Sequence, residues 1–235
     1  MSARNTSDGG VVETPLDALL AEYVNGTLSP SLTVLVASHL ELKPDSRGYV
    51  ASLASAAGQW LDSVDPVPIA RRTAMLKAIL DSDDRPSESV PAAPSPADAF
   101  DPAIPAALRR HIEAHPPKPQ WRWVLPGVRK LQVSCDVGDQ AFLLHGRPGR
   151  ALPAHVHNGT EVALVLSGSY ADAAGRYIRG DIAICEGGTE HRPIIDHGED
   201  CLCMIVLDGP IRLSGPVGRV IDWVTCGSVG RLIGG

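Results

Sequence analysis

The first third of the chain carries apolar residues at helical spacing. Residues 15–24 read P-L-D-A-L-L-A-E-Y-V and are followed by Asn25 and Gly26, a common helix stop. Ser29 suits an N-cap, and Pro30 suits the first turn of a second helix, S-P-S-L-T-V-L-V-A-S-H-L-E-L. The pattern predicts two short helices in succession.

Two more helices are expected before residue 81. One starts at Pro44 and runs through R-G-Y-V-A-S-L-A-S-A-A-G-Q-W-L, and the other covers residues 68–80. Four short helices predict a small bundle with a marginal apolar core. Candidate partner contacts are the exposed faces of 16–25 and 30–42. The leucines expected in the core are Leu19, Leu20, Leu32, Leu35 and Leu40.

The composition changes abruptly after these helices. Residues 81–99 are rich in Pro, Ser and acidic residues, which is typical of a flexible linker. A short helix is expected around residues 106–115. We therefore divide the chain into a helical domain (1–80), a linker (81–102) and a second domain (103–235).

The second domain reads as strands separated by Gly, Asn and Asp turns, as expected of an all-β barrel. The fold class predicted is α+β and multi-domain, with a small N-terminal helical bundle joined to that barrel. The predicted strands are W-R-W-V-L, R-K-L-Q-V-S-C-D, Q-A-F-L-L-H-G, E-V-A-L-V-L-S-G, G-D-I-A-I-C, C-L-C-M-I-V-L and V-G-R-V-I-D-W-V.

Composition and charge indicate where the protein is located and what kind of partner it binds. The first residues contain no signal-peptide core and no stretch approaches a membrane-spanning length, so we expect a cytoplasmic protein without membrane contact. Residues 1–100 hold 7 Lys/Arg and 13 Asp/Glu, whereas the rest of the chain is balanced. This acidic half disfavours direct nucleic-acid binding and suits a basic protein partner, although a well-solvated helical face explains it equally well.

Three histidines and a glutamate are spaced as ligands of one metal ion. His155 and His157 share a strand face because alternate side chains point the same way. Glu161 follows the turn-prone N-G-T, and His191 comes from a later strand pair. Three imidazoles and a carboxylate suit zinc, iron, manganese, nickel or copper.

These residues resemble the two cupin motifs. The first, G-x5-H-x-H-x3-E-x6-G, is met at every defined position from Gly149 to Gly168. The second is met at its glycines and at the histidine, but Glu186 replaces the usual proline and Ile195 the usual asparagine. The resemblance implies a double-stranded β-helix barrel with the metal inside one end.

A helical module followed by a metal cupin resembles the ChrR-type anti-sigma factors. The likeness lies in L-D-A-L-L-A-E-Y-V-N-G-T-L-S and V-A-S-H-L, in the ligand set, and in Cys201-x-Cys203. It implies that the helices sequester an extracytoplasmic-function sigma factor by steric occlusion. It further implies that the cupin, with zinc as its expected metal, senses singlet oxygen or peroxide.

The helical module departs from that family at its structural zinc site. His39 stands at the family's histidine, but Lys43 and Ser46 occupy the two cysteine positions and Thr14 lies near the place of the earlier histidine. One histidine cannot hold a structural zinc, which needs about four ligands. We expect no zinc in this module and regard His39 as an ordinary polar residue near a helix end.

The five cysteines do not indicate a disulfide scaffold, because their number is odd and none forms a Cys-x-x-Cys pair. The candidate redox-sensing residues are Cys201, Cys203 and Cys185, since thiols near a metal are oxidisable. Buried apolar filling is an equally good reading of Cys201 and Cys203. It is the better one for Cys135 and Cys226.

The alternative function is a metal-dependent cupin enzyme, resembling a dioxygenase or an isomerase, acting on a small organic substrate. No catalytic residue is evident beyond the ligands. Glu190, Arg150 and Tyr170 are conceivable neighbours of the metal. The linker and acidic helices have no role in such an enzyme, so we favour the regulator. The sequence leaves open a homodimer.

Overall fold

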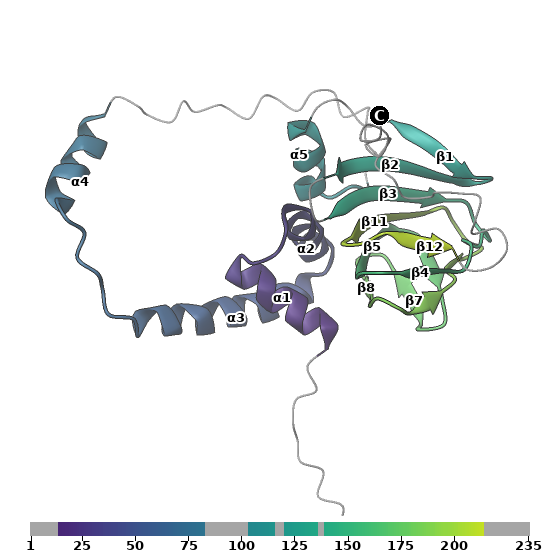
Figure 1. Ribbon diagram of the computed structural model, residues 1–235, viewed down its shortest axis with the longest axis horizontal. Helices are drawn as coiled ribbons and strands as arrows, with labels where there is room; N and C mark the ends of the chain where they lie inside the picture. The colour runs from purple at the N-terminus through teal and green to yellow at the C-terminus, as the bar shows by residue number, and fades with distance from the viewer. Residues whose placement is uncertain (1–13, 83–102, 116–119, 136–138, 214–235) are drawn as a thin grey trace, which may run out of the picture.

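The computed structural model of the chain describes residues 14–82, 103–115, 120–135 and 139–213. Helices come first and a β-barrel follows, so the predicted α+β class is confirmed (Figure 1). The predicted linker lies almost entirely outside the described residues. The last predicted strand and Cys226 also lie outside them.

The helices fall close to the predicted segments, with one shifted start. Arg71 has a left-handed backbone (φ 62°), and the fourth helix begins only after it, four residues later than predicted. The helices are α1 (Pro15–Asn25), α2 (Pro30–Leu42), α3 (Pro44–Asp62), α4 (Arg72–Asp81) and α5 (Ala106–Ala114).

The ends of the first two helices follow from local hydrogen bonding. Thr14 and Asp17 form a capping box, in which each side chain accepts from the other residue's backbone N–H. Gly26 ends α1 in the left-handed conformation (φ 68°) that glycine tolerates best. Ser29 caps α2 by accepting from the Leu32 N–H, as predicted.

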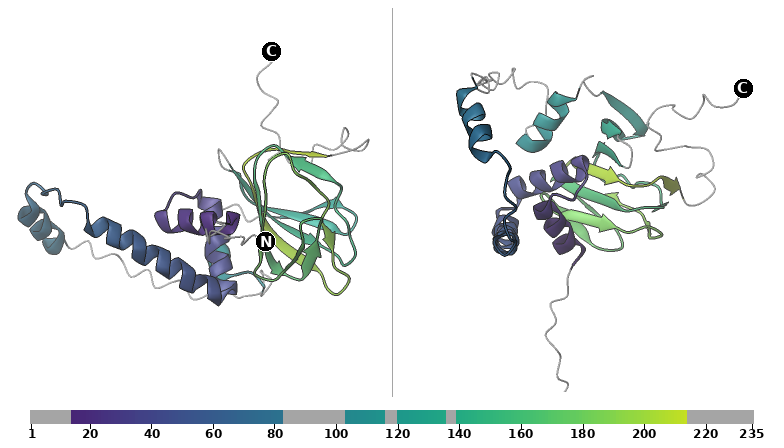
Figure 2. Two further views of the ribbon diagram at one scale, coloured as in Figure 1. Left: turned by 90° about the horizontal axis from the view of Figure 1, so that it is seen from below. Right: turned by 60° about the vertical axis from the view of Figure 1, so that its left-hand side comes forward.

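The described β-residues form a six-stranded antiparallel sheet, in the order β1-β2-β3-β11-β5-β8, and two three-stranded sheets, β10-β6-β7 and β12-β4-β9. The strands are β1 (Trp121–Leu125), β2 (Val128–Cys135), β3 (Gln140–Gly146), β4 (His155–His157), β5 (Glu161–Ser167), β6 (Ser169–Ala171), β7 (Arg176–Ile178), β8 (Ile182–Cys185), β9 (Glu190–His191), β10 (Ile194–Ile195), β11 (Cys201–Leu207) and β12 (Ile211–Leu213). The small sheets close the barrel opposite the large one (Figure 2).

The large sheet is covered on both faces. Its inner face packs into the barrel against Leu152, Tyr170 and Ile195, and its outer face packs against helices. Every residue of β11 is therefore buried, and so is all of β5 except Ser167. Two buried faces explain why these strands are continuously apolar instead of alternating.

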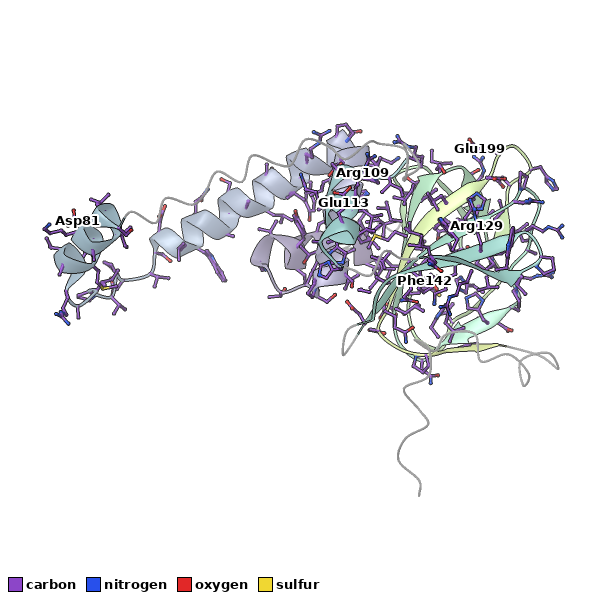
Figure 3. All side chains as sticks on the ribbon, turned by 90° about the horizontal axis from the view of Figure 1, so that it is seen from above. Asp81, Arg109, Glu113, Arg129, Phe142 and Glu199 are labelled. Carbon is purple, nitrogen blue, oxygen red and sulfur yellow. The ribbon has the colours of Figure 1, made fainter. Side chains whose placement is uncertain are left out.

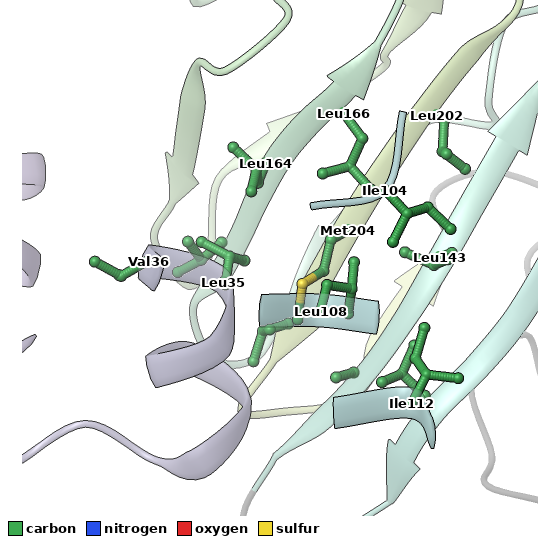
Figure 4. Close-up of a cluster of buried hydrophobic side chains, with 14 of the residues drawn as sticks. Leu35, Val36, Ile104, Leu108, Ile112, Leu143, Leu164, Leu166, Leu202 and Met204 are labelled. Carbon is green, nitrogen blue, oxygen red and sulfur yellow. The ribbon is translucent and has the colours of Figure 1, made fainter. Parts of the chain in front are cut away.

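The N-terminal helices form the predicted small bundle, in which α1 and α2 both contact α3, but its apolar core is shared with the barrel. Helices α1, α2 and α5 bury their apolar faces against the outer face of the large sheet, with Leu35 and Leu108 beside Met204 and Leu143 (Figure 4). Neither α3 nor α4 has a buried residue, and α4 extends away from the barrel (Figures 1 and 3). An apolar face packs where the larger apolar surface lies, and here that surface is the sheet.

Helix α5 is held to the helical module by a carboxylate. The two oxygens of Glu41, on α2, accept hydrogen bonds from the N–H groups of Ala106 (2.7 Å) and Ala107 (2.8 Å). These are two of the N–H groups that a helix start leaves without an intrahelical partner. The negative charge also opposes the positive end of the α5 dipole.

Candidate functional site

Three strands bring the predicted ligands to one place. His155 and His157 alternate on β4, with both side chains buried, and His155 pairs directly with His191 of β9. Glu161 is the first residue of β5, at the end nearest β4. The four side chains are at most 9% exposed, and each can offer one atom to a common point.

The ligand atoms lie close enough to share one ion. His191 Nε2 lies 2.9 Å from the Nε2 atoms of both His155 and His157. The Glu161 carboxylate lies 3.4 Å from His157 Nε2 and 3.9 Å from His191 Nε2. All four ligand atoms fall within 4.8 Å of one another.

The outward hydrogen bonds determine which histidine nitrogens face the centre. His155 Nδ1–H donates to the Pro153 carbonyl (2.8 Å), and His191 Nδ1–H donates to the Asp172 carboxylate (3.2 Å). In the neutral rings both Nε2 atoms then carry lone pairs. Two lone pairs 2.9 Å apart repel unless a cation lies between them, so this donor set fits a metal ion.

Burial also sets the protonation that a metal requires. It lowers the pKa of His155 to about 4 and, together with the neighbouring imidazoles, that of His157 to about 3. Burial and the Asp172 charge raise the pKa of Glu161 to about 8. At neutral pH these two imidazoles are in the ligating form, while the carboxylate loses its proton when a cation binds.

The motif glycines are required by the backbone. Gly168 has φ 68°, and a Cβ there would overlap the carbonyl oxygen of Asp200. Gly180 has φ 87° and allows the Lys43 side chain to lie against it. The two departures from the second motif leave the ligands in place, because Glu186 is exposed and Ile195 packs in the barrel interior.

Of the three conceivable neighbours of the metal, the structure places two at the site. Tyr170 is buried and lines an apolar cavity of about 40 Å³ together with Glu161. Glu190 is exposed but lines the recess at the barrel mouth together with Glu161 and His191, whereas Arg150 is exposed and lines neither space. The sequence analysis missed Asp172, which lies 19 residues from His191 on the β6–β7 turn and belongs to no motif.

The candidate redox cysteines take two different positions. Cys201 and Cys203 are buried on the inner face of β11, their sulfur atoms 3.6 Å apart, and both line the 40 Å³ cavity. Cys185 pairs with Glu161 across β5–β8 and lines a recess of about 260 Å³ at the barrel mouth. The side chain of Cys135 is not among those described.

A polar junction links the helices to the barrel and corrects the reading of His39. His39 is buried, its Nδ1–H donates to the carbonyl of Gly180 (2.7 Å), and its Nε2 accepts from the Ser46 hydroxyl (2.9 Å). Lys43 forms an ion pair with Asp181 (2.9 Å). His39 and Lys43 thus tie the helices to the turn that opens the second motif, and Ser46 holds the ring of His39.

The junction continues at the start of α2. Ser29 and Ser31 donate to the buried carboxylate of Asp139, and the Ser31 hydroxyl lies 2.8 Å from that of Ser134. Serines of the helical module therefore satisfy a carboxylate of the barrel. Buried polar groups need such partners, which makes the docking specific.

Comparison with known proteins places the chain among regulators. Residues 110–211 match the ChrR cupin-like domain family. The anti-sigma-E factor ChrR of Cereibacter sphaeroides is 32% identical over 206 residues, which cover 88% of this chain and 94% of that protein. Within the described residues, none of the helices is long and apolar enough to cross a membrane.

Solved structures give the same result. The crystal structure of Rhodobacter sphaeroides SigE in complex with the anti-sigma ChrR matches with a TM-score of 0.67 and 31% identity, over 82% of this chain and 96% of that one. An RmlC-like cupin protein from Ralstonia eutropha matches with a TM-score of 0.40 and 20% identity, over 44% of this chain and 72% of that one. The latter similarity is too low to bear on function.

Proposed function

This chain belongs to the ChrR family of anti-sigma factors, and we propose that its cupin barrel controls the grip of its helices on an extracytoplasmic-function sigma factor. The anti-sigma role and the sigma-factor partner follow from the family. Metal binding, oxidative sensing and a cytoplasmic location are the proposed parts.

One observation carries the proposed binding surface: α3 and α4, with the segment between them, expose a continuous series of large apolar side chains. Trp60 is 83% exposed and Val67 is 85% exposed. Exposed apolar side chains gathered in this way mark a partner surface. The side chains more than half exposed are Trp60, Leu61, Val64, Val67, Ile69, Met75, Leu76, Ile79 and Leu80.

This surface differs from the candidate faces chosen from the sequence. The apolar sides of residues 16–25 and 30–42 pack on the barrel, while their exposed faces, the candidates from the sequence, stay untested. The start of α3 packs on the shared core through Val50 and Leu53, whereas residues 54–82 are exposed throughout and α4 extends outward (Figure 3). A partner that packs between and around them buries the exposed side chains, and its surface for RNA polymerase is then blocked.

The surface is tested by substitution of exposed residues, since these do not support the fold. We expect Trp60→Ser and Ile79→Ser to weaken binding of the partner sigma factor at least about tenfold, as buried anchors of interfaces do. The matched control is Ile194→Ser on the barrel, which alters a 44% exposed residue. Wild-type affinity in both α3 and α4 variants would remove this surface from the proposal.

The metal centre is proposed to be the sensing end of the molecule. His155, His157, Glu161 and His191 would hold one divalent ion, with zinc as the family's expectation. When bound, the ion would supply a positive charge that fixes β4, β5 and β9 to one another. Metal analysis of protein purified without added metal identifies the ion. One zinc per chain is expected, and one iron, manganese or nickel per chain would mean that this metal occupies the site instead.

The two central strands connect this end to the helices. Strand β5 directs Glu161 to the site and Val162, Leu164 and Leu166 to the helix-covered face. Strand β11 directs Cys201 and Cys203 inward and Met204 outward. A change inside the barrel that moves either strand therefore alters the surface on which α2 rests.

Oxidation of the cysteine pair is the proposed signal. A peroxide can take two electrons and the two thiol protons from Cys201 and Cys203, forming a disulfide and water. The sulfur atoms would then move from 3.6 Å to about 2.05 Å apart, which shifts β11. The hydrogen bond to Cys201 and burial raise the pKa of the Cys203 thiol, so Cys203 is protonated at neutral pH and reacts slowly with weak oxidants.

The signal is tested on the intact complex with the sigma factor. Peroxide or photogenerated singlet oxygen is expected to release the partner from wild-type protein but not from a Cys201→Ser, Cys203→Ser double variant. Cys185→Ser shows whether the thiol in the mouth recess contributes. Equal release from wild-type and double-variant complexes would exclude the pair as the sensor.

The enzyme alternative is disfavoured by the family of the chain, because the similarity to an anti-sigma factor covers the helices as well as the barrel. The spaces beside the ligands do not exclude a substrate: the interior cavity measures about 40 Å³ and the mouth recess about 260 Å³, but an open recess beside His191 and Asp172 measures about 650 Å³. Sites for small organic molecules usually measure about 300–1,000 Å³. Metal-dependent turnover of an organic acid or a diketone by the full chain would restore the alternative.

A further inference from the structure

Asp172 is a buried carboxylate with a defined role for each oxygen. One oxygen accepts hydrogen bonds from the backbone N–H groups of Ala174 (2.9 Å) and Gly175 (3.2 Å) in the β6–β7 turn. The other accepts from Nδ1–H of His191 (3.2 Å). The side chain is 6% exposed, so solvent barely competes for these contacts.

The orientation of the Asp172 carboxylate is determined within its own turn and does not depend on His191. Two N–H groups hold the first oxygen, and the planar carboxylate then has its second oxygen in a set direction. His191 lies on another sheet, across the barrel end from this turn. The second Asp172 oxygen therefore determines the orientation of the His191 ring, and it favours the tautomer in which Nδ1 carries the proton.

The other two histidines lack such a partner. His155 Nδ1 donates to a neutral carbonyl, that of Pro153, within its own segment. His157 Nδ1 is buried and has no hydrogen-bond partner among the described residues. Among the three histidines, His191 alone has a carboxylate at its Nδ1, the nitrogen that faces away from the ligand centre.

We propose that Asp172 is a positioning residue for the metal centre, holding His191 so that Nε2 points at the ion. The inference rests on the metal centre proposed above. A carboxylate behind a ligating imidazole keeps Nδ1 protonated, raises the basicity of Nε2 and fixes the ring plane.

Asp172→Asn separates this role from the support of the turn. The asparagine oxygen can still accept from Ala174 and Gly175, but its NH₂ group then faces Nδ1–H of His191, donor against donor. We expect the affinity for Zn²⁺, measured by competition with a chromophoric chelator on the full chain, to fall about 10- to 100-fold. The metal-free variant should unfold at the wild-type denaturant concentration.

A second measurement reports the geometry at saturation. With Co²⁺ as the probe, the visible absorption bands of Asp172→Asn should shift from those of wild-type protein, because His191 turns. The matched control is Asp200→Asn, which breaks a similar carboxylate–histidine pair, Asp200 with His145 at 3.0 Å. That pair lies away from the ligands, so neither affinity nor spectrum should change.

The outcomes distinguish this inference from the metal centre itself. Wild-type protein that binds no stoichiometric Zn²⁺ would overturn both. Stoichiometric binding by wild-type protein, with the same affinity and Co²⁺ spectrum in Asp172→Asn, would overturn the role of Asp172 alone. Equal losses in Asp172→Asn and Asp200→Asn would also contradict it, because the effect would then be nonspecific.

Discussion

At the scale of single residues, the barrel end depends on four side chains that converge and on the groups that orient them. Spacing was sufficient to place His155, His157, Glu161 and His191 together, because strand alternation and turns determine direction. Asp172 could not be found in this way, since its contact with His191 joins two sheets. His39 was misread because its partner, a backbone carbonyl 141 residues away, has no sequence pattern.

Replacement of one ligand should abolish metal binding. His157 is buried and faces two of the other ligands, so His157→Ala removes a central donor. We expect the metal content of the purified chain to fall from about one ion to near zero, because a closed site needs about four ligands. His145→Ala is the control, since His145 pairs with Asp200 elsewhere. Full occupancy in His157→Ala would refute the site.

Acidification should loosen the junction through His39. Burial lowers the pKa of His39 below its ordinary value of 6.5, with a further lowering by Lys43 that the Gly180 carbonyl and Asp181 partly offset. Neutral His39 contributes its full share to the stability of the folded chain above pH 6.5. This contribution is lost as the pH falls from there towards the lowered pKa, because His39 of the unfolded chain takes up its proton first.

The experiment compares wild-type protein with His39→Gln by denaturant unfolding at about pH 8 and about pH 5.5. Other histidines titrate in both proteins and cancel in the difference. Wild-type protein should lose more stability on acidification than the variant. The same loss in both would mean that His39 does not titrate as its burial implies.

At the scale of elements, caps and turns made the helices predictable, whereas their packing was not. Ser29 with Pro30, and Gly26 after Asn25, are local signals and were read correctly. The position of α1 and α2 on the sheet is a long-range choice. Its one trace in the sequence is the unbroken apolar character of β5 and β11, which indicates strands covered on both faces.

The start of α5 offers an element-scale test. Glu41→Ala removes both acceptors from the Ala106 and Ala107 N–H groups, and we expect a loss of about 1 kcal/mol in the free energy of unfolding. Glu22→Ala, on the exposed side of α1, should change it by less than about 0.5 kcal/mol. Denaturant titrations followed by circular dichroism measure both, and equal small effects would show that the cap is not stabilising.

At the scale of the whole molecule, the helices and the barrel share one apolar core. Leu35 and Leu108 are fully buried against Met204 and Leu143, so neither side can lose its cover without exposing the other. The boundary between the helical and cupin domains was predicted from composition, which shows where the chain is polar. Composition does not show that the apolar faces of the helices pack on the large sheet of the barrel.

A shared core predicts joint unfolding. In a Trp60→Phe background, which removes the tryptophan of α3, Leu35→Ala should lower the free energy of unfolding by about 2–5 kcal/mol and shift the helix signal and the tryptophan signal together. Leu80→Ala, at a 75% exposed position of α4, should change stability by less than about 0.5 kcal/mol. Two separate transitions, with only the helix signal shifted, would show that the barrel is stable without the helices.

The polar junction restricts how these modules can be exchanged in evolution or in engineering. A grafted helical module without Lys43 would leave Asp181 without its ion-pair partner, and one without Ser46 would leave the His39 ring without its second hydrogen bond. A graft lacking the serines of α2 would leave the Asp139 carboxylate buried and unsatisfied. Chimeras of this family therefore require the helices to be transferred together with the β7–β8 turn and with Ser134 and Asp139.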